Sequence, residues 1–111
     1  MELKRGDVYW VNFDPSIGGE ITKIRPAVVI SNNANNRYAN RVQVVPVTSN
    51  TEKIYPTETM VFIGSKKAKA MADQLTTVSK LRIKDKITSL TNIEISDIER
   101  AIKLQLGLSV Y

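Results

Sequence analysis

Short runs of β-branched and aromatic residues, separated by turn-forming residues, fill the first two thirds of the chain. Their length and alternation predict strands rather than helices. Six strands are expected, over residues 7–13, 25–31, 41–49, 57–63, 70–78 and 85–90. The asparagine-rich stretch 32–40 is predicted to be a turn, and Gly64 with Lys66 and Lys67 is predicted to form a hairpin-like turn.

The end of the chain has the pattern of an amphipathic helix. Thr91 is followed three residues later by Glu94, which predicts a capping box, and Gly107 is a C-terminal stop signal. One helical stripe contains Ile95, Ile98, Ala101, Ile102 and Leu106. Three further apolar residues lie off this stripe: Ile93, Leu104 and Leu108. They are either scattered surface residues or a second apolar face that meets another chain.

These elements predict a mostly β domain, a small antiparallel barrel or curled sheet with the C-terminal helix covering one open side. At 111 residues, the chain is expected to form one domain over 1–111. Its apolar runs are far shorter than the ~20 residues that span a bilayer. The charged N-terminus lacks the apolar core of a signal peptide. We therefore expect a soluble cytoplasmic protein without a membrane partner.

The composition removes several chemistries. The sequence contains neither cysteine nor histidine. This excludes disulfides, thiolate or imidazole metal sites, a cysteine nucleophile and a Ser-His relay. Catalysis by this chain would have to rely on arginine, lysine, carboxylate, hydroxyl and backbone groups.

The net charge of +5 is distributed unevenly. Residues 21–86 carry twelve lysines and arginines against four acidic residues, a net of +8, whereas both flanking segments are slightly acidic. A concentration of positive charge in the middle of the chain fits either a polyanion-binding surface or an ordinary solvated basic face.

An arginine stands at the start of the second predicted strand, in "ITKIRPAVVISNN". If the second and third strands pair as a hairpin, Arg25 lies beside Thr48 at the end of the third. A guanidinium group next to a hydroxyl group is suited to a phosphate. Taken singly, each residue also fits a plain strand end.

Several segments in this order resemble the MazF/PemK family of toxin endoribonucleases. The similarity rests on "RGDVYWVNFDPSIGGEITKIRPAVVISN", "VVPVTSN", "ADQLTTVSKLRI" and "IERAIKLQLGL". The resemblance implies an SH3-like barrel and a homodimer that cuts single-stranded RNA without a metal or other cofactor. It also implies inhibition by a cognate antitoxin protein. The implied products are a 2′,3′-cyclic phosphate and a 5′-hydroxyl group.

By position, the resemblance assigns the catalytic roles to Arg25 and Thr48. Glu20 matches a loop acid that aids activity in some relatives, and Gln74 is a weaker candidate for RNA contact. A guanidinium group is a poor base because its pKa is above 12. We therefore expect Arg25 to act as an electrostatic clamp and a proton donor to the leaving oxygen. The base is left open between Glu20 and water.

The basic segment could supply further RNA contacts, and each of its charges also fits an ordinary solvated surface. Candidate phosphate contacts are Arg37, Arg41, Lys53, Lys66, Lys67 and Lys69. Tyr38 and Tyr55 fall in predicted loops and are candidate platforms for bases, whereas Tyr9, Trp10 and Phe13 are expected in the core.

Two other functions stay open from the sequence. A gyrase-poisoning toxin of the same fold would use its C-terminal helix rather than Arg25. A nucleic-acid-binding module without catalysis would bind RNA and leave it intact.

Overall fold

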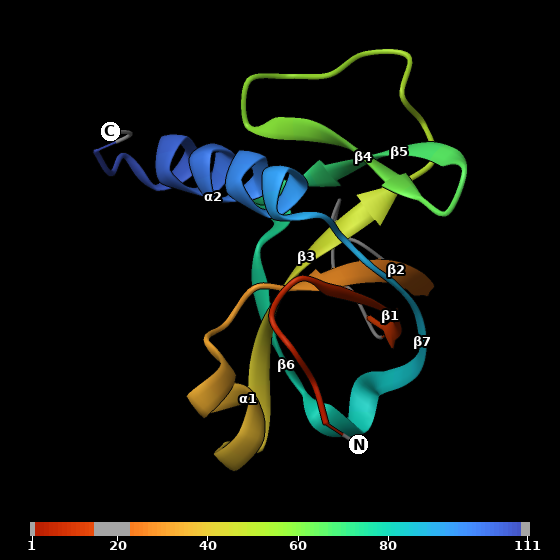
Figure 1. The fold of residues 1–111 in the computed structure, drawn as a ribbon, viewed down its shortest axis with the longest axis vertical. Helices are drawn as coiled ribbons and strands as arrows, with labels where there is room; N and C mark the ends of the chain where they lie inside the picture. Colours follow the sequence, from red (N-terminus) through yellow and green to blue (C-terminus); the bar gives the residue numbers. More distant parts are fainter. Residues whose placement is uncertain (1, 15–22, 110–111) are drawn as a thin grey trace.

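The computed structural model describes residues 2–14 and 23–109. A strongly curled sheet carries one long helix against it (Figure 1). The strands are β1 (Asp7–Asn12), β2 (Ile24–Val29), β3 (Arg41–Thr48), β4 (Glu58–Ile63), β5 (Lys66–Met71), β6 (Thr76–Ser79) and β7 (Ile83–Ser89). The helices are α1 (Asn33–Tyr38) and α2 (Asn92–Leu106), with the 3-10 turns η1 (Ala72–Gln74) and η2 (Lys80–Arg82).

β3 is the central strand, because it pairs antiparallel with three others. β2 lies along one of its edges. On the other edge, β6 pairs with the first half of β3 and β5 with its last two residues. β4 continues the sheet beyond β5, and β1 and β7 continue it beyond β2. The expected barrel is confirmed as a mostly β, curled antiparallel half-barrel with a C-terminal helix.

Pro46 occupies the point at which β3 changes partner. Pairing with β6 ends at Val44, and pairing with β5 begins at Val47. The Gln43 carbonyl accepts the N–H of Ile30 on the β2 side, so by alternation Pro46 directs its nitrogen toward the opposite edge. Because no ladder bond is made there, the missing proline N–H costs nothing in pairing.

Alternate residues of the strands fill two separate cores. The core beneath α2 consists of Val8, Val28, Ile30, Val45, Val47, Val61, Ala68, Ala70, Leu90 and Ile98. The opposite face packs Leu3, Tyr9, Val11, Ala27, Val29, Val42, Val44, Val78 and Ile83. The strict alternation along β2 and β3 fixes their register, because a slip by one residue would exchange the two faces.

The predicted helix is confirmed as α2, with its capping box and a left-handed Gly107 at its end. Ile98 and Ala101 are the buried residues of its stripe. Leu106, also predicted on that stripe, is exposed, as are the off-stripe residues Ile93, Leu104 and Leu108.

The asparagine-rich segment 32–40 is helical in its middle, so its prediction as a turn is wrong. The Asn32 side chain accepts the N–H of Asn35 at 2.8 Å and starts α1. Asn36 is buried, and its amide donates to the Ser31 carbonyl at 2.8 Å. The cap at Asn32 and the bond of Asn36 to Ser31, just after β2, select a helix over the turn that asparagine favours by itself.

The segment after β4 also differs from the prediction. Lys66 and Lys67 begin β5, and only residues 64–65 make the turn. The strand expected over 70–78 is divided into the end of β5, η1 and β6, so the sheet has seven strands rather than six. Lysines are uncommon in strands, and they concealed β5 in the sequence.

Among the residues described, no helix is long and apolar enough to cross a membrane.

Gly6 is a position where the fold requires glycine. Its backbone donates to the Val29 carbonyl at 2.7 Å and accepts from the Leu90 N–H at 2.9 Å. Its φ is +93°, and a Cβ there would lie 2.3 Å from Cδ1 of Ile95. We expect Gly6→Ala to lower the free energy of unfolding by roughly 2–4 kcal/mol, measured by urea denaturation.

The matched control for this prediction is Gly64→Ala. Gly64 also has a positive φ, of +64°, but a Cβ there meets no atom within 4 Å. Its expected loss is about 1–2 kcal/mol, from the left-handed backbone alone. Equal losses in the two variants would show that contact with Ile95 is not what requires glycine at position 6.

Glu94 joins α2 to the sheet and makes stability depend on pH. Burial disfavours the charged form of Glu94. The hydrogen bonds from Thr91 and from the Phe62 N–H together outweigh this effect and lower the pKa of Glu94. Because the folded pKa lies below the unfolded one, this stabilisation is complete above the ordinary value of 4.5 and is lost as the pH falls through the folded pKa.

Glu94→Gln should flatten the acid limb of the stability curve, that is, the fall of the melting temperature as the pH is lowered, measured by thermal unfolding at a series of pH values. Glu52→Gln, an exposed loop substitution, should leave that limb as steep as in the wild type.

Candidate active site

A pocket of about 340 Å³ opens where residues of β1, β2, β3, β4, β5 and β7 come together. Its lining residues are Trp10, Arg25, Pro26, Val47, Thr48, Ser49, Ile63, Lys66, Lys67, Ala68 and Ile87. We call it the Arg25–Thr48 pocket. Its lining is apolar in part, and its charged members are all cationic. Its apolar surface can therefore bind a neutral, flat group, and its positive rim can bind an anion.

The register of the sheet brings Arg25 and Thr48 together. The β2–β3 pairing sets Ala27 opposite Pro46. Extended by two residues, the same register sets Arg25 opposite Thr48, and both line the pocket. This confirms the hairpin geometry predicted from the sequence. Both side chains are half-buried, so each is anchored in the sheet and still reaches solvent.

The end of β3 orients the Thr48 hydroxyl. Its oxygen accepts the N–H of Asn50 at 3.3 Å, as the chain turns away from the strand. An oxygen that accepts from the backbone directs its own proton elsewhere. Thr48 therefore has a hydrogen to donate to an oxygen bound in the pocket.

Trp10 is a pocket residue that the sequence interpretation missed. It was expected in the core, but 42% of its surface is exposed, and it stands opposite Pro26 in the sheet. Trp10 shares a strand face with Val8, which is fully buried beneath α2. The sequence did contain a signal for this exposure: Trp10 stands near the end of its strand, and residues at a strand end can extend beyond the core.

The predicted RNA contacts divide into groups. Lys66 and Lys67 line the pocket. Lys53 and Tyr55 belong to the β3–β4 loop, where the Lys53 ammonium lies 5.5 Å from the centre of the Tyr55 ring. Gln74 is half-buried at the end of η1, a turn that packs against α2. Glu20 lies outside the described residues.

Arg37 and Arg41 lie at the other end of the molecule. Arg41 begins β3 and Thr48 ends it, seven residues later, which corresponds to roughly 23 Å. Arg37 belongs to α1, and its guanidinium stacks over Tyr38 at 5.6 Å. Figure 1 shows α1 at the end of β3 opposite the β4–β5 pair. A ligand in the pocket would have to extend along the molecule to reach these residues.

Lys69 was expected to contact phosphate, but it is only 8% exposed. Its ammonium pairs with the Glu58 carboxylate at 2.9 Å and donates to the Lys53 carbonyl at 2.7 Å. The structure thus commits its charge to neighbours within the chain.

The acidic residues do not supply a metal site in the described part of the chain. No group of three acidic side chains there could hold a metal ion. The groups that the pocket presents are guanidinium, ammonium, hydroxyl and aromatic groups, which bind phosphates and bases directly.

The chain is similar to known proteins over nearly its whole length. The family model described as "PemK-like, MazF-like toxin of type II toxin-antitoxin system" matches residues 4–106. "Endoribonuclease MazF9" of Mycobacterium tuberculosis is 34% identical over 115 residues, covering 96% of this chain and 98% of that protein.

Two solved structures show the same fold. MazF of Deinococcus radiodurans superposes with a TM-score of 0.86 at 25% identity, covering 97% of this chain and 99% of that one. An endoribonuclease in complex with its cognate antitoxin, from mycobacterial species, has a TM-score of 0.80 at 27% identity and covers 96% of each chain.

Proposed function

This chain belongs to the PemK-like, MazF-like toxins of type II toxin–antitoxin systems, and we propose that it is an endoribonuclease that cleaves single-stranded RNA in the Arg25–Thr48 pocket. The observation that carries the proposal is the meeting of a guanidinium and a hydroxyl group in one pocket with a cationic rim. The identity of 34% to an endoribonuclease over nearly the whole chain supports the same activity.

The proposed reaction uses the RNA itself as the nucleophile. The ribose 2′-oxygen forms a bond to the adjacent phosphorus, and the bond from phosphorus to the 5′-oxygen breaks. The products are a 2′,3′-cyclic phosphate and a 5′-hydroxyl group. This route needs neither a protein nucleophile nor a metal, which suits a chain without histidine and cysteine.

Arg25 and Thr48 stabilise the transition state in this proposal. Negative charge accumulates on the non-bridging phosphate oxygens, where a guanidinium fork and a hydroxyl can donate. Arg25 is the candidate donor of the proton that the 5′-oxygen takes up. The proton of the 2′-hydroxyl goes to Glu20 or to water.

The RNA path follows from the placement of the cations. Lys66 and Lys67 contact phosphates at the pocket rim, and the exposed face of Trp10 takes a base. Further contacts come from Lys53, Tyr55 and Gln74. Arg37 and Arg41 bind only an RNA long enough to extend along β3.

The remaining assignments rest on the family. We expect residues 1–111 to act as one toxin domain, to associate as a homodimer and to work in the cytoplasm. One structural neighbour is an endoribonuclease bound to its cognate antitoxin. An antitoxin protein that covers the cationic pocket would keep RNA out of it.

Substitution of Arg25 should abolish cleavage. We expect the wild type, in EDTA, to cut a single-stranded RNA of defined sequence at specific sites and to leave 5′-hydroxyl ends. Arg25→Ala should lower kcat at least 100-fold, because transition-state donors are worth about that much or more. Arg25→Lys keeps the charge without the fork and should recover little activity. The readout is end mapping together with initial rates.

The control for this experiment is Arg100→Ala, which removes an exposed arginine of α2 outside the pocket and should cut at the wild-type rate. RNA left intact by the wild type would contradict the proposal. RNA binding without cutting would indicate a binding module, and gyrase-dependent DNA breaks would indicate a gyrase poison.

The fluorescence of Trp10 should report RNA in the pocket, because it is the only tryptophan in the chain. We expect 2′-O-methyl RNA containing the mapped cleavage sequence to quench its emission, since a stacked base covers the exposed ring. Trp10→Phe should bind this RNA within about threefold of the wild type, and Trp10→Ala about tenfold more weakly. Binding without any change in emission would remove Trp10 from the RNA path.

A further inference from the structure

We propose that the buried Lys69–Glu58 ion pair is a positioning device that holds Tyr55 and Lys53 of the β3–β4 loop beside Thr48, as a platform for one nucleotide of the RNA. This inference rests on the proposed function and assigns a part of the substrate site to residues outside the pocket.

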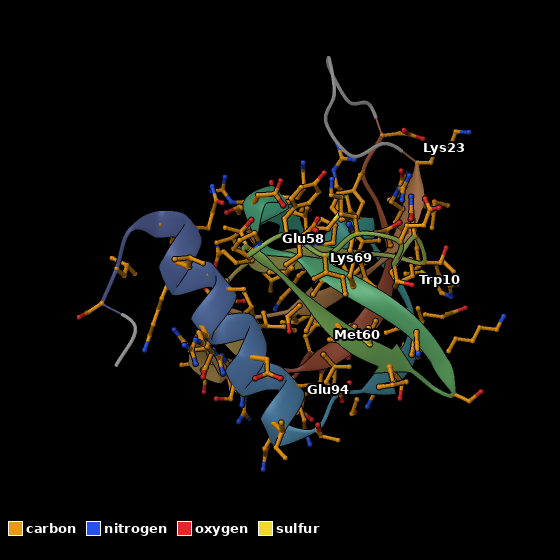
Figure 2. All side chains as sticks on the ribbon, turned by 90° about the horizontal axis from the view of Figure 1, so that it is seen from above. Trp10, Lys23, Glu58, Met60, Lys69 and Glu94 are labelled. Atoms are coloured by element: carbon orange, nitrogen blue, oxygen red, sulfur yellow. The ribbon has the colours of Figure 1, made fainter. Side chains whose placement is uncertain are left out.

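Lys69 is joined directly to the candidate catalytic residue through the sheet. The β3–β5 pairing sets Lys69 opposite Thr48. Directly opposed residues project from the same face of a sheet, so the Lys69 side chain leaves β5 next to that of Thr48. In the view of Figure 2, Lys69 is seen between Glu58 and Trp10.

The ion pair is bonded to the loop at two points. The Lys69 ammonium donates to the Lys53 carbonyl at 2.7 Å and to Glu58 Oε1 at 2.9 Å. The same carboxylate oxygen accepts the N–H of Tyr55 at 2.8 Å. One buried pair therefore fixes the backbone of the loop on both sides of Ile54.

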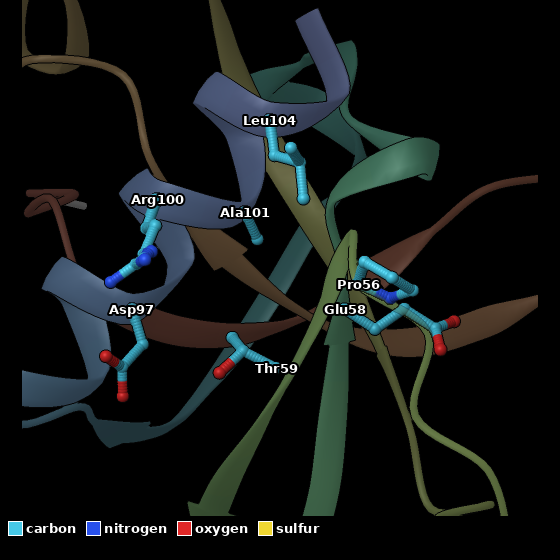
Figure 3. Close-up of a pocket in the computed structure, with 7 residues that line it drawn as sticks. All are labelled: Pro56, Glu58, Thr59, Asp97, Arg100, Ala101 and Leu104. Carbon is cyan, nitrogen blue, oxygen red and sulfur yellow. The ribbon is translucent and has the colours of Figure 1, made fainter. Parts of the chain in front are cut away.

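The Glu58 carboxylate bonds to Lys69 and the loop rather than to residues of α2. It lines the groove between β4 and α2, which also contains Asp97 and Arg100. Figure 3 shows the Glu58 carboxylate pointing away from Asp97 and Arg100. Its ionic partner is accordingly Lys69.

Besides the ion pair, the loop is held by the Glu58 N–H, which donates to the Tyr55 carbonyl at 2.9 Å, and by the Glu52 N–H, which donates to Asn50 Oδ1 at 3.2 Å. Its residues 52–56 are all exposed, so they contribute little packing in a core. Tyr55 is 52% exposed, and its ring has the ammonium groups of Lys53 and Lys69 at 5.5 and 5.6 Å from its centre. An exposed aromatic ring suits a stacked base, and the exposed Lys53 beside it suits the phosphate that follows.

Stability alone does not account for the pair. Its side chains are only 10% and 9% exposed. At such sites, apolar residues of similar size often stabilise a protein as well as the ions do, because both charges must be desolvated. Placement of the loop is a use that apolar residues could not supply, since they cannot bond to the Lys53 carbonyl and the Tyr55 N–H.

The test replaces both charges together, in Lys69→Met/Glu58→Leu. This double variant keeps the net charge of the chain and leaves no buried charge unpaired. We expect its Kd for 2′-O-methyl RNA and its KM for cleavable RNA to rise about tenfold, with kcat changed less than threefold. Tyr55→Ala should have a similar effect. The triple variant combines Tyr55→Ala with the double substitution. Its Kd should rise by less than the product of the two separate fold-changes, because both changes remove the same platform.

The matched control is Lys84→Met/Asp85→Leu, which also removes one charge of each sign, from exposed positions in β7. It should bind and cleave as the wild type does. Glu58→Gln keeps an oxygen for the Tyr55 N–H and should have an intermediate effect, which provides a readout if the double variant does not fold.

The outcomes separate this inference from the proposed function. A wild type that cleaves, alongside a folded double variant with wild-type Kd and KM, would overturn the positioning role alone. The positioning role would also be overturned if the Kd of the triple variant rose by the full product of the fold-changes of the Tyr55 and ion-pair substitutions. A wild type that binds RNA without cutting would overturn the ribonuclease, and the Kd comparison would still decide the role of the pair. A wild type that neither binds nor cuts overturns both.

Discussion

The antiparallel pairing of β3 with β2 is the constraint on which the rest of the molecule depends. The register that places Val45 and Val47 in the core beneath α2 also sets Thr48, on the alternate face of β3, at the edge of the pocket. The same register sets Arg25 across from Thr48. A slip by one residue would remove the valines from the core and Thr48 from the pocket together. Hydrophobic burial therefore enforces the geometry of the candidate site.

The fold of the sheet decides which of the basic residues lie near the pocket. The sequence concentrates basic residues between positions 21 and 86, but the fold distributes them over both ends of β3. Lys66 and Lys67 reach the Arg25–Thr48 pocket, whereas Arg41 lies roughly 23 Å from Thr48. Net charge alone describes long-range attraction of RNA. The placement of each cation decides which of them can reach a phosphate bound in the pocket.

Sequence reasoning succeeded where local chemistry and the fold point the same way. The capping box predicted α2, and the pairing of the second and third strands, on which the meeting of Arg25 and Thr48 was conditional, is present. At α1 it passed over a local signal, since the Asn32 side chain caps the helix by accepting the N–H of Asn35. Elsewhere it failed where contacts outside the local pattern decide, as they do for the exposure of Trp10 and the burial of Lys69.

An active site without histidine has to draw its rate from position and electrostatics. A guanidinium group stays charged at any physiological pH and is a poor base, so its main contribution is a fixed positive charge beside the phosphate. Intramolecular attack by the 2′-oxygen instead rewards a phosphate and ribose that are held in line, because orientation alone can remove much of a barrier. Two adjacent strands fix Arg25 and Thr48, and the Lys69–Glu58 pair fixes the loop beside them. The rigidity of this end of the sheet is thus part of the chemistry that we propose for it.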